Sequence, residues 1–193
     1  KSVDIAKLQL AAGAVGVCCA KLGEAEALAE GGVQNILITS PVVTPQAIER
    51  LIALNGKIGQ LRVVADNPDN VDALASATKA AGKALDVLVD IDPGIRRTDV
   101  ATPEAAVALA QRIAAAETLR FAGVQYYCGA QQHIESFADR RAAIADRTDY
   151  LRRVIEALSR AGYAPEVVTG GGTGTHRIDA ELGVLTELQA GSY

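Results

Sequence analysis

Short, continuous runs of apolar residues alternate along this chain with alanine-rich segments of helical period, and this alternation restricts the fold more than any other feature. The runs lie at 15–20, 36–40, 61–66, 85–92, 121–127, 165–169 and 184–188. Because they are continuous rather than alternating in hydropathy, they predict parallel strands buried on both faces. Repeated strand–helix units of this kind form either a doubly wound sheet or a (β/α)8 barrel.

The segments between the apolar runs have the pattern of amphipathic helices. Apolar residues recur at three- and four-residue intervals in 3–12, 24–30, 45–54, 70–81, 103–115 and 140–161. Thr44-Pro45 and Thr102-Pro103 each place a capping residue before a proline that suits the first helical turn. Glycines follow three of the runs where helix ends are expected, at Gly31-Gly32, Gly82 and Gly162.

The two ends of the sequence lead us to expect one domain, residues 1–193, from a longer two-domain protein. The chain contains no methionine and opens on Lys1-Ser2. Seven runs, together with one strand expected upstream of Lys1, give the eight strands of a barrel. We therefore expect an α/β fold of the (β/α)8 type whose first strand lies outside this chain. A doubly wound sheet stays open as the alternative.

Charge and cysteine content argue against several classes of function. The net charge of −4 gives no electrostatic reason to expect nucleic acid or an anionic membrane surface as a partner. The apolar runs are far shorter than the roughly 20 residues of a membrane span. The three cysteines, Cys18, Cys19 and Cys128, are odd in number and two are adjacent, which argues against a disulfide framework. They have no CxxC spacing, which argues against a cysteine metal site. We expect a cytoplasmic protein with reduced thiols.

A run of glycines and threonines, 169–175, follows the sixth apolar run and is the sharpest local signal. Glycine lets backbone N–H groups approach an anion closely, and threonine hydroxyls add further donors, so the run predicts a phosphate site. It lacks the Lys-Ser/Thr ending of a nucleotide P-loop and has no GxGxxG spacing, which argues against ATP and dinucleotides. The alternative is a flexible turn between a strand and a helix.

Two further strand ends carry candidate side chains. The fourth run ends in Asp90 and Asp92 and is followed by two arginines, and an arginine at a barrel rim can bind a phenolate, carboxylate or phosphate oxygen. The alternative there is a surface salt bridge between Asp92 and an arginine. The fifth run ends at Tyr127, and His133, six residues further on, could act as a general base near neutral pH. His176 is the competing histidine, and a solvated loop side chain is the alternative for both.

Taken together, these segments resemble the fold-type III pyridoxal-phosphate enzymes. The branch they resemble most contains D-threonine aldolases, D-serine dehydratases and 3-hydroxy-D-aspartate aldolases, which share an alanine racemase-like barrel. The resemblance rests on segments in the family's order along the whole chain: 1–6, 16–26, 35–40, 90–98, 127–133, 170–175 and 187–193.

The resemblance implies roles for particular residues. Arg97 falls where the family has an arginine near the phenolic oxygen of the cofactor. Tyr127 matches a tyrosine that packs beside the cofactor and is counted among the catalytic candidates. His133 matches a histidine that acts on the β-hydroxyl of the substrate. The residues implied in binding the phosphate are Gly171, Gly172, Thr173 and Thr175, with further contacts from Ser192 and Tyr193.

Other parts of the implied site lie outside this chain. Lys1 matches the second lysine of the family's Lys-Thr-His-Lys segment, so the lysine that binds the cofactor covalently is expected three residues upstream. A divalent metal (Mg²⁺, Mn²⁺ or Zn²⁺) is expected on ligands from a C-terminal β-domain, and no metal ligand is assigned within 1–193. The family also suggests a homodimer.

The implied function is a pyridoxal-phosphate-dependent lyase that acts on small D-3-hydroxy amino acids. His133 favours retro-aldol cleavage of D-threonine-like substrates to glycine and an aldehyde. A dehydratase acting on D-serine or 3-hydroxy-D-aspartate is the first alternative. An alanine racemase-like isomerase and a non-catalytic pyridoxal-phosphate-binding protein stay open as well.

Overall fold

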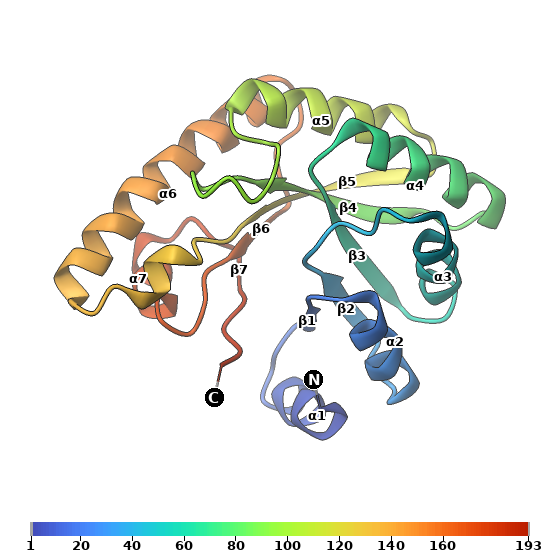
Figure 1. Cartoon of the computed structure of the whole chain (residues 1–193), viewed down its shortest axis with the longest axis horizontal. Helices are drawn as coiled ribbons and strands as arrows, with labels where there is room; N and C mark the ends of the chain where they lie inside the picture. Colours follow the sequence, from blue (N-terminus) through green and yellow to red (C-terminus); the bar gives the residue numbers. More distant parts are fainter. Residues whose placement is uncertain (1, 193) are drawn as a thin grey trace. The chain divides into compact units, whose positions relative to one another are not determined.

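The structure of the chain, a computed structural model, describes residues 2–192. The chain divides into two compact units (Figure 1). The first unit comprises Lys1–Val87 and Arg112–Arg120, and the second comprises Leu88–Gln111 and Phe121–Tyr193. All the described residues that the sequence assigns to the candidate site belong to the second unit.

The strands are adjacent in the same order in which they occur along the chain. They are β1 (Val17–Cys19), β2 (Asn35–Ile38), β3 (Gln60–Ala65), β4 (Leu85–Ile91), β5 (Leu119–Tyr126), β6 (Val167–Gly170) and β7 (Glu187–Leu188). A doubly wound sheet would contain a point at which this order reverses. The doubly wound alternative is therefore wrong, and the order is that of a barrel. The eighth strand, expected upstream of Lys1, stays a prediction.

Each predicted helix is present. The helices are α1 (Val3–Ala11), α2 (Leu22–Glu30), α3 (Pro45–Asn55), α4 (Pro68–Ala81), α5 (Pro103–Ala115), α6 (Phe137–Arg160) and α7 (His176–Leu182), with a 3-10 turn at Ala130–His133. Thr44 and Thr102 cap α3 and α5 through their hydroxyls, as expected. Helix α6 begins three residues earlier than predicted because the Ser136 hydroxyl accepts from the Asp139 N–H.

In the first unit, α2, α3 and α4 follow β1, β2 and β3 and bury their apolar faces. Strands β1, β2 and β3 pair in parallel, and Ile36 lies opposite Val17 on one side and Leu61 on the other. Leu51 of α3 and Leu74 of α4 are almost completely buried. The first unit therefore has the layered core that continuous apolar strands predict.

An ion pair with a largely buried carboxylate and a half-exposed arginine joins strands of the first unit. The Asp86 carboxylate accepts hydrogen bonds from Arg120 Nε at 2.8 Å and Nη2 at 2.6 Å, and from Gln60 Nε2 at 3.2 Å. Burial of the carboxyl opposes its ionisation, but the hydrogen bonds from Arg120 and Gln60 outweigh burial and lower the pKa of Asp86 below its usual value. Asp86 is therefore charged in the folded protein at neutral pH.

Replacing Asp86 with asparagine should destabilise the protein in a pH-dependent way. A lowered carboxyl pKa contributes stability that is present above the unfolded pKa of about 4 and is lost as the pH falls through the folded pKa. At pH 7 we expect Asp86→Asn to lower the free energy of unfolding by about 1–3 kcal/mol. In urea titrations the difference from wild type should narrow below about pH 4.

Asp72, which pairs with Arg112 at the surface, provides the matched control. Both partners are about half exposed, so Asp72→Asn should change stability little. Equal stability of Asp86→Asn and wild type at pH 7 would show that the Asp86 pair does not hold these strands together.

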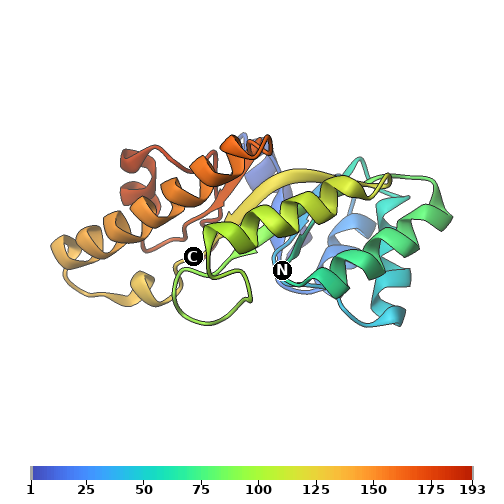
Figure 2. The same ribbon diagram turned by 90° about the horizontal axis from the view of Figure 1, so that it is seen from above.

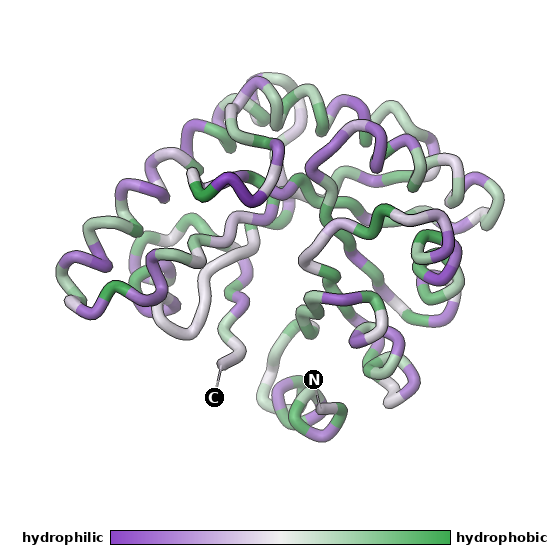
Figure 3. The backbone as a smooth tube through the Cα atoms, viewed as in Figure 1, coloured by the Kyte–Doolittle hydropathy of each residue, from purple (hydrophilic) through white to green (hydrophobic). Residues whose placement is uncertain are grey.

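In the second unit, the long helix α6 fixes the loop that follows β4 (Figures 1 and 2). Tyr126 Oη donates to the Arg147 carbonyl at 2.9 Å, and Arg147 Nη1 donates to the Pro93 carbonyl at 3.0 Å. Tyr150 Oη donates to the Ala101 carbonyl at 2.9 Å. Hydrophobic and hydrophilic residues alternate along α6 (Figure 3), and Ile144, the first residue of its buried face, is almost fully buried.

The pairing of β5, β6 and β7 brings the segments that follow these strands to one edge. Tyr126 lies opposite Gly170, and Gly170 lies opposite Leu188, all in parallel register. The segments that begin at Tyr127, Gly171 and Gln189 therefore start side by side. No helix among the described residues is long and apolar enough to cross a membrane.

Candidate functional site

The loop after β4 is shaped by the Asp92 carboxylate. Asp92 Oδ1 accepts from the backbone N–H groups of Gly94 at 3.2 Å, Ile95 at 3.0 Å and Arg96 at 3.0 Å. These bonds close a tight turn in which Arg96 has a φ of 57°. The Asp92 carboxylate therefore accepts from backbone N–H groups and shapes the turn. One of the two arginines considered as its salt-bridge partner, Arg97, pairs with Asp90 instead. The turn delivers the next residue, Arg97, to a fixed place.

Arg97 pairs with Asp90, the other carboxylate of this strand end. Its Nη2 lies 3.2 Å from Asp90 Oδ1 and 3.1 Å from Asp90 Oδ2. The Asp90 side chain is 1% exposed, whereas the Arg97 side chain is 36% exposed. The guanidinium carbon of Arg97 also lies 5.7 Å from the centroid of the Tyr127 ring, within cation–π range. Arg97 is thus held between a buried carboxylate and an aromatic ring, with part of its donor set facing solvent.

The two adjacent tyrosines at the end of β5 have different environments. Tyr126 is buried, and burial raises the pKa of its phenol well above the usual value, so it serves as a neutral donor to α6. Tyr127 is half-buried and contacts Arg97. Burial also raises the pKa of Cys128 to about 12, which makes this thiol a poor nucleophile. Tyr127 is therefore the tyrosine placed to contact a ligand.

The two histidines lie in adjoining segments. His133 ends the 3-10 turn Ala130–His133 and is exposed. His176 Nδ1 lies 2.9 Å from the Thr173 carbonyl, so His176 braces the glycine run from the start of α7. Of the two, His133 is the one whose ring faces solvent at a strand end.

The glycine run after β6 forms a compact loop, which we call the glycine loop (170–175). Gly170, Gly171, Gly172 and Thr175 are buried, whereas Thr173 and Gly174 are exposed. The Thr175 hydroxyl accepts from the Gly172 N–H at 3.2 Å. The loop therefore folds around its own hydroxyl and presents its tip, at Thr173 and Gly174, to solvent.

Asp179 of α7 packs against the glycine loop from inside. Gly171 has a φ of +69°, and a Cβ there would lie 2.6 Å from Asp179 Oδ2. Burial raises the pKa of Asp179, against a hydrogen bond with Thr175 and the nearby His176, which act to lower it. Among the described residues, Asp179 Oδ2 is buried and has no hydrogen-bond partner. Close packing here explains why position 171 is glycine.

The segment after β7 is bonded to the tip of the glycine loop. Thr173 Oγ1 accepts from the backbone N–H groups of Gly191 at 3.2 Å and Ser192 at 2.9 Å. It also lies 3.3 Å from the Ser192 carbonyl. Ser192 is thus bonded to the glycine loop, its phosphate contact stays a prediction, and Tyr193 lies outside the described residues.

The predicted site residues form a chain of contacts across four strand ends, those of β4, β5, β6 and β7. Arg97 contacts Tyr127, the turn after Tyr127 is bonded to the glycine loop, and Thr173 bonds to Ser192. His133 belongs to that turn. Lys1, like Tyr193, lies outside the described residues, and the lysine expected upstream of Lys1 stays a prediction.

Three residues of this network were not assigned roles from the sequence. Asp90 pairs with Arg97, and its place before a run of two arginines was the available signal. Gln132 bonds to the glycine loop, and Gln189 Nε2 donates to Gln125 Oε1 at 3.2 Å and to Thr169 Oγ1 at 3.0 Å. No motif distinguishes either glutamine, because an amide takes its role from partners distant in sequence.

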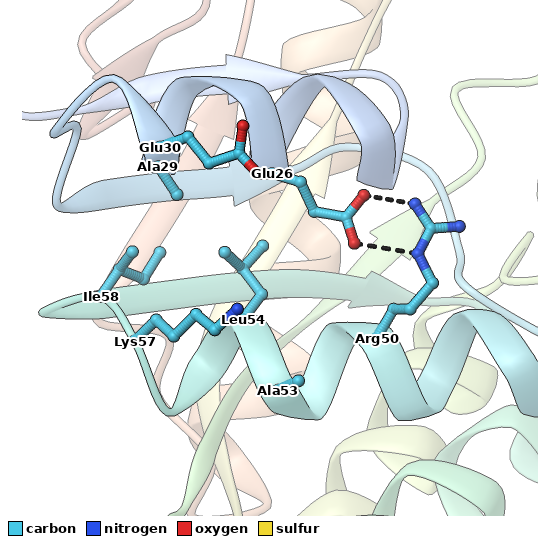
Figure 4. A pocket seen from close by; sticks show the side chains of 8 residues that line it. All are labelled: Glu26, Ala29, Glu30, Arg50, Ala53, Leu54, Lys57 and Ile58. Carbon is cyan, nitrogen blue, oxygen red and sulfur yellow. Dashed lines mark hydrogen bonds and ion pairs between the residues drawn. The ribbon is translucent and has the colours of Figure 1, made fainter.

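Two cavities of the first unit involve none of these residues. One, of about 390 Å³, lies between α2 and α3 beside the ion pair of Glu26 and Arg50 (Figure 4). The other, of about 610 Å³, lies between α3 and α4 and is lined by alanines and by Ile48 and Ile52. The first cavity is also lined by the charged side chains of Glu30 and Lys57, whereas the second is mainly apolar and has few of the polar groups that orient a small molecule.

Comparison with known proteins places the chain in a family. The family described as alanine racemase, N-terminal domain, matches residues 1–193. The chain belongs to this family. The expected alanine racemase-like α/β fold is therefore confirmed.

The relatives include aldolases and a dehydratase. A 3-hydroxy-D-aspartate aldolase of Paracoccus denitrificans (strain Pd 1222) is 43% identical over 100% of this chain and 50% of its own length. The crystal structure of D-threonine aldolase from Filomicrobium marinum matches with a TM-score of 0.96 and 40% identity, over 99% of this chain and 52% of that one. D-threo-3-hydroxyaspartate dehydratase from Delftia sp. HT23 matches with a TM-score of 0.88 and 27% identity, over 99% and 50%. The chain spans about half the length of the relatives it matches.

Replacing Gly171 with alanine should test the packing of the glycine loop. The positive φ costs an alanine about 1 kcal/mol, and the contact with Asp179 adds an overpacking cost of about 1–3 kcal/mol. Gly183 is the matched control, because its φ is +64° but nothing lies within 4 Å of an added Cβ. Gly171→Ala should lower the free energy of unfolding clearly more than Gly183→Ala in urea titrations. Equal losses would mean that Asp179 does not press on position 171.

Proposed function

We propose that this chain is the pyridoxal-phosphate-binding barrel domain of a lyase that acts on small D-3-hydroxy amino acids. The reaction we favour is retro-aldol cleavage of a D-threonine-like substrate to glycine and an aldehyde. The observation that carries the proposal is the contact chain from Arg97 and Tyr127 through the 3-10 turn to the glycine loop. The aldolases among the relatives support the same reaction class.

The residues present fit the phosphate of the cofactor. The glycine loop has a tip without side-chain bulk at Gly174, and hydroxyls at Thr173 and Thr175. Next to it are the backbone N–H groups of Gly191 and Ser192, which already point at an oxygen atom, Thr173 Oγ1. Closely spaced N–H and hydroxyl donors of this kind suit an anion. Gly171, Gly172, Thr173, Thr175 and Ser192 would hold the phosphate, and Tyr193 is proposed with them.

The residues at the other end of the contact chain fit the ring of the cofactor. Arg97 keeps donors toward solvent while Asp90 fixes its position, so it would donate to the phenolic oxygen of the ring. Tyr127 is half-buried beside Arg97 and would pack against the ring. When bound, the cofactor supplies an electron sink for the charge left when a bond to the substrate's α-carbon breaks.

His133 is the proposed proton acceptor. In a retro-aldol cleavage the β-hydroxyl loses its proton as the Cα–Cβ bond breaks, the β-carbon leaves as the aldehyde, and the α-carbon is protonated to give glycine. An exposed histidine at the strand ends can take the hydroxyl proton near neutral pH, directly or through a water molecule.

The metal and the subunit partner are proposed from outside this chain. Within residues 2–192, no group of three His, Cys, Asp or Glu side chains is arranged to hold a metal ion, so no step is assigned to one. We propose that Mg²⁺, Mn²⁺ or Zn²⁺ binds mainly to a C-terminal domain, and that the lysine bound to the cofactor precedes Lys1. A single barrel domain at 1–193, a homodimer and a cytoplasmic location belong to the same proposal.

Product analysis should separate the proposed reaction from its alternatives. The complete gene product, loaded with pyridoxal phosphate and supplied with Mg²⁺ or Mn²⁺, is given D-threonine, D-serine and D-3-hydroxyaspartate in turn. We expect glycine and an aldehyde, and L-threonine is the control that should not react. A keto acid with ammonia would instead indicate a dehydratase, and an L-amino acid product would indicate an isomerase. A protein that binds the cofactor but turns over none of these would be a carrier.

Replacing His133 with alanine should remove cleavage while leaving the cofactor bound. Loss of a general base lowers kcat by about 10²–10⁴-fold. Cofactor affinity should not change, because His133 is not among the residues proposed to hold the phosphate or the ring. Glu135→Ala, an exposed position two residues further on, is the control. Undiminished cleavage by His133→Ala would exclude this histidine from the reaction.

A further inference from the structure

Gln132 joins the turn that carries His133 to the glycine loop. Its Oε1 accepts from the Gly174 N–H at 2.9 Å, and its Nε2 donates to Thr175 Oγ1 at 2.8 Å. Both ends of the amide are therefore bonded to the same loop. Gln132 is half-buried and lies 42 residues before Gly174 in the sequence.

Two glycines of the loop make room for this side chain. A Cβ at position 172 would lie 2.8 Å from Gln132 Oε1, and a Cβ at 174 would lie 2.6 Å from the Gln132 carbonyl oxygen. A larger residue at 174 would push the backbone of the turn away from the loop, and one at 172 would displace the Gln132 amide. The glycine content of the loop is thus set in part by Gln132, and not only by a bound anion.

Gln132 also helps to fix the orientation of the Thr175 hydroxyl. That oxygen accepts from both Gln132 Nε2 and the Gly172 N–H. Two donors on one hydroxyl oxygen fix its orientation, and through it the backbone between Gly172 and Thr175. The loop therefore keeps its shape through an amide that contributes no charge.

We infer that Gln132 is a positioning residue for the phosphate site, and that the amide's neutrality is part of its role. This inference rests on the proposed function. A glutamate at 132 has the same shape, and its carboxylate can still accept from the Gly174 N–H. It cannot donate to Thr175 Oγ1 as Gln132 Nε2 does, and it would add a negative charge next to the loop that holds a phosphate dianion. The added charge repels a ligand that carries the phosphate and not one that lacks it.

The test compares pyridoxal phosphate with pyridoxal, which lacks the phosphate. For the complete gene product, the Kd of pyridoxal divided by the Kd of pyridoxal phosphate reports what the phosphate contributes to binding. Gln132→Glu should lower this ratio by about tenfold or more, because the added charge weakens the binding of pyridoxal phosphate and not that of pyridoxal. The loss should shrink in added salt, which screens repulsion between charges.

Two other variants keep the test decisive. Gln131→Ala is the matched control: Gln131 lies in the same turn, and its buried Oε1 has no hydrogen-bond partner among the described residues. It should leave the ratio unchanged. Gln132→Ala removes both bonds without adding charge and should lower the ratio by about three- to tenfold. If Gln132→Glu does not fold, this variant decides alone.

The outcomes separate the inference from the function on which it rests. A folded Gln132→Glu or Gln132→Ala protein whose ratio stays within twofold of wild type would overturn the role of Gln132. A wild-type protein that binds pyridoxal phosphate no more tightly than pyridoxal would overturn the proposed function itself. A ratio lowered in both Gln132 variants but not in Gln131→Ala supports the assignment.

Discussion

A buried carboxylate that carries its charge needs a partner, and in the second unit the partner of Asp90 is the residue proposed to meet the cofactor ring. Asp90 is 1% exposed, and leaving its charge without a partner would cost several kcal/mol. Arg97 supplies the counter-charge with one nitrogen and keeps the rest of its guanidinium toward solvent and the Tyr127 ring. The position of Arg97 is therefore dictated from the interior of the protein, before any ligand is present. The loop that carries it is held independently, by Asp92 on one side and by Arg147 of α6 on the other.

The shape of the glycine loop is also fixed by the protein itself, through hydrogen bonds rather than an ion pair. A loop of this composition would lose much conformational entropy on ordering, because glycine has the most backbone freedom to lose. Hydrogen bonds within the protein already hold the loop in shape: the Gly172 N–H bonds to Thr175, the Gly174 N–H bonds to Gln132, and the N–H groups of Gly191 and Ser192 bond to Thr173 Oγ1. The ordering cost is thus met during folding, and a ligand that binds the finished loop does not have to meet it again.

The sequence predicted most of the fold because each strand and helix is specified locally. The runs at 85–92 and 121–127 overlap β4 and β5 almost completely, and Thr44 and Thr102 cap the helices they were expected to cap. Helix α7 escaped prediction because seven residues are too few to display a period. The strand order could not be settled by periodicity, since barrel and doubly wound sheets share the same local pattern.

Some residues of the candidate site could likewise be predicted from the sequence, and others could not. Arg97, Tyr127 and the glycine loop could be singled out because arginine, tyrosine and repeated glycine at strand ends are unusual in themselves. Both Asp90 and Asp92 are buried, and Arg97 pairs with Asp90 because the Asp92 carboxylate accepts from backbone N–H groups of the turn. That division between the two carboxylates is a property of the folded loop. Gln132 is harder still, because its role exists only through atoms more than 40 residues away.

Neighbouring residues of the turn Ala130–His133 have two different proposed roles: Gln132 positions the glycine loop, and His133 accepts a proton. A 3-10 turn has about three residues per turn, so adjacent side chains point in directions about 120° apart. Gln132 accordingly faces the glycine loop while His133 is exposed. Under the proposed function, Gln132, which holds the phosphate-binding loop, is directly followed by His133, which accepts the proton. Loss of the bonds between Gln132 and the glycine loop would then displace His133 as well. Arg97, which is anchored through Asp90 and α6, would keep its place.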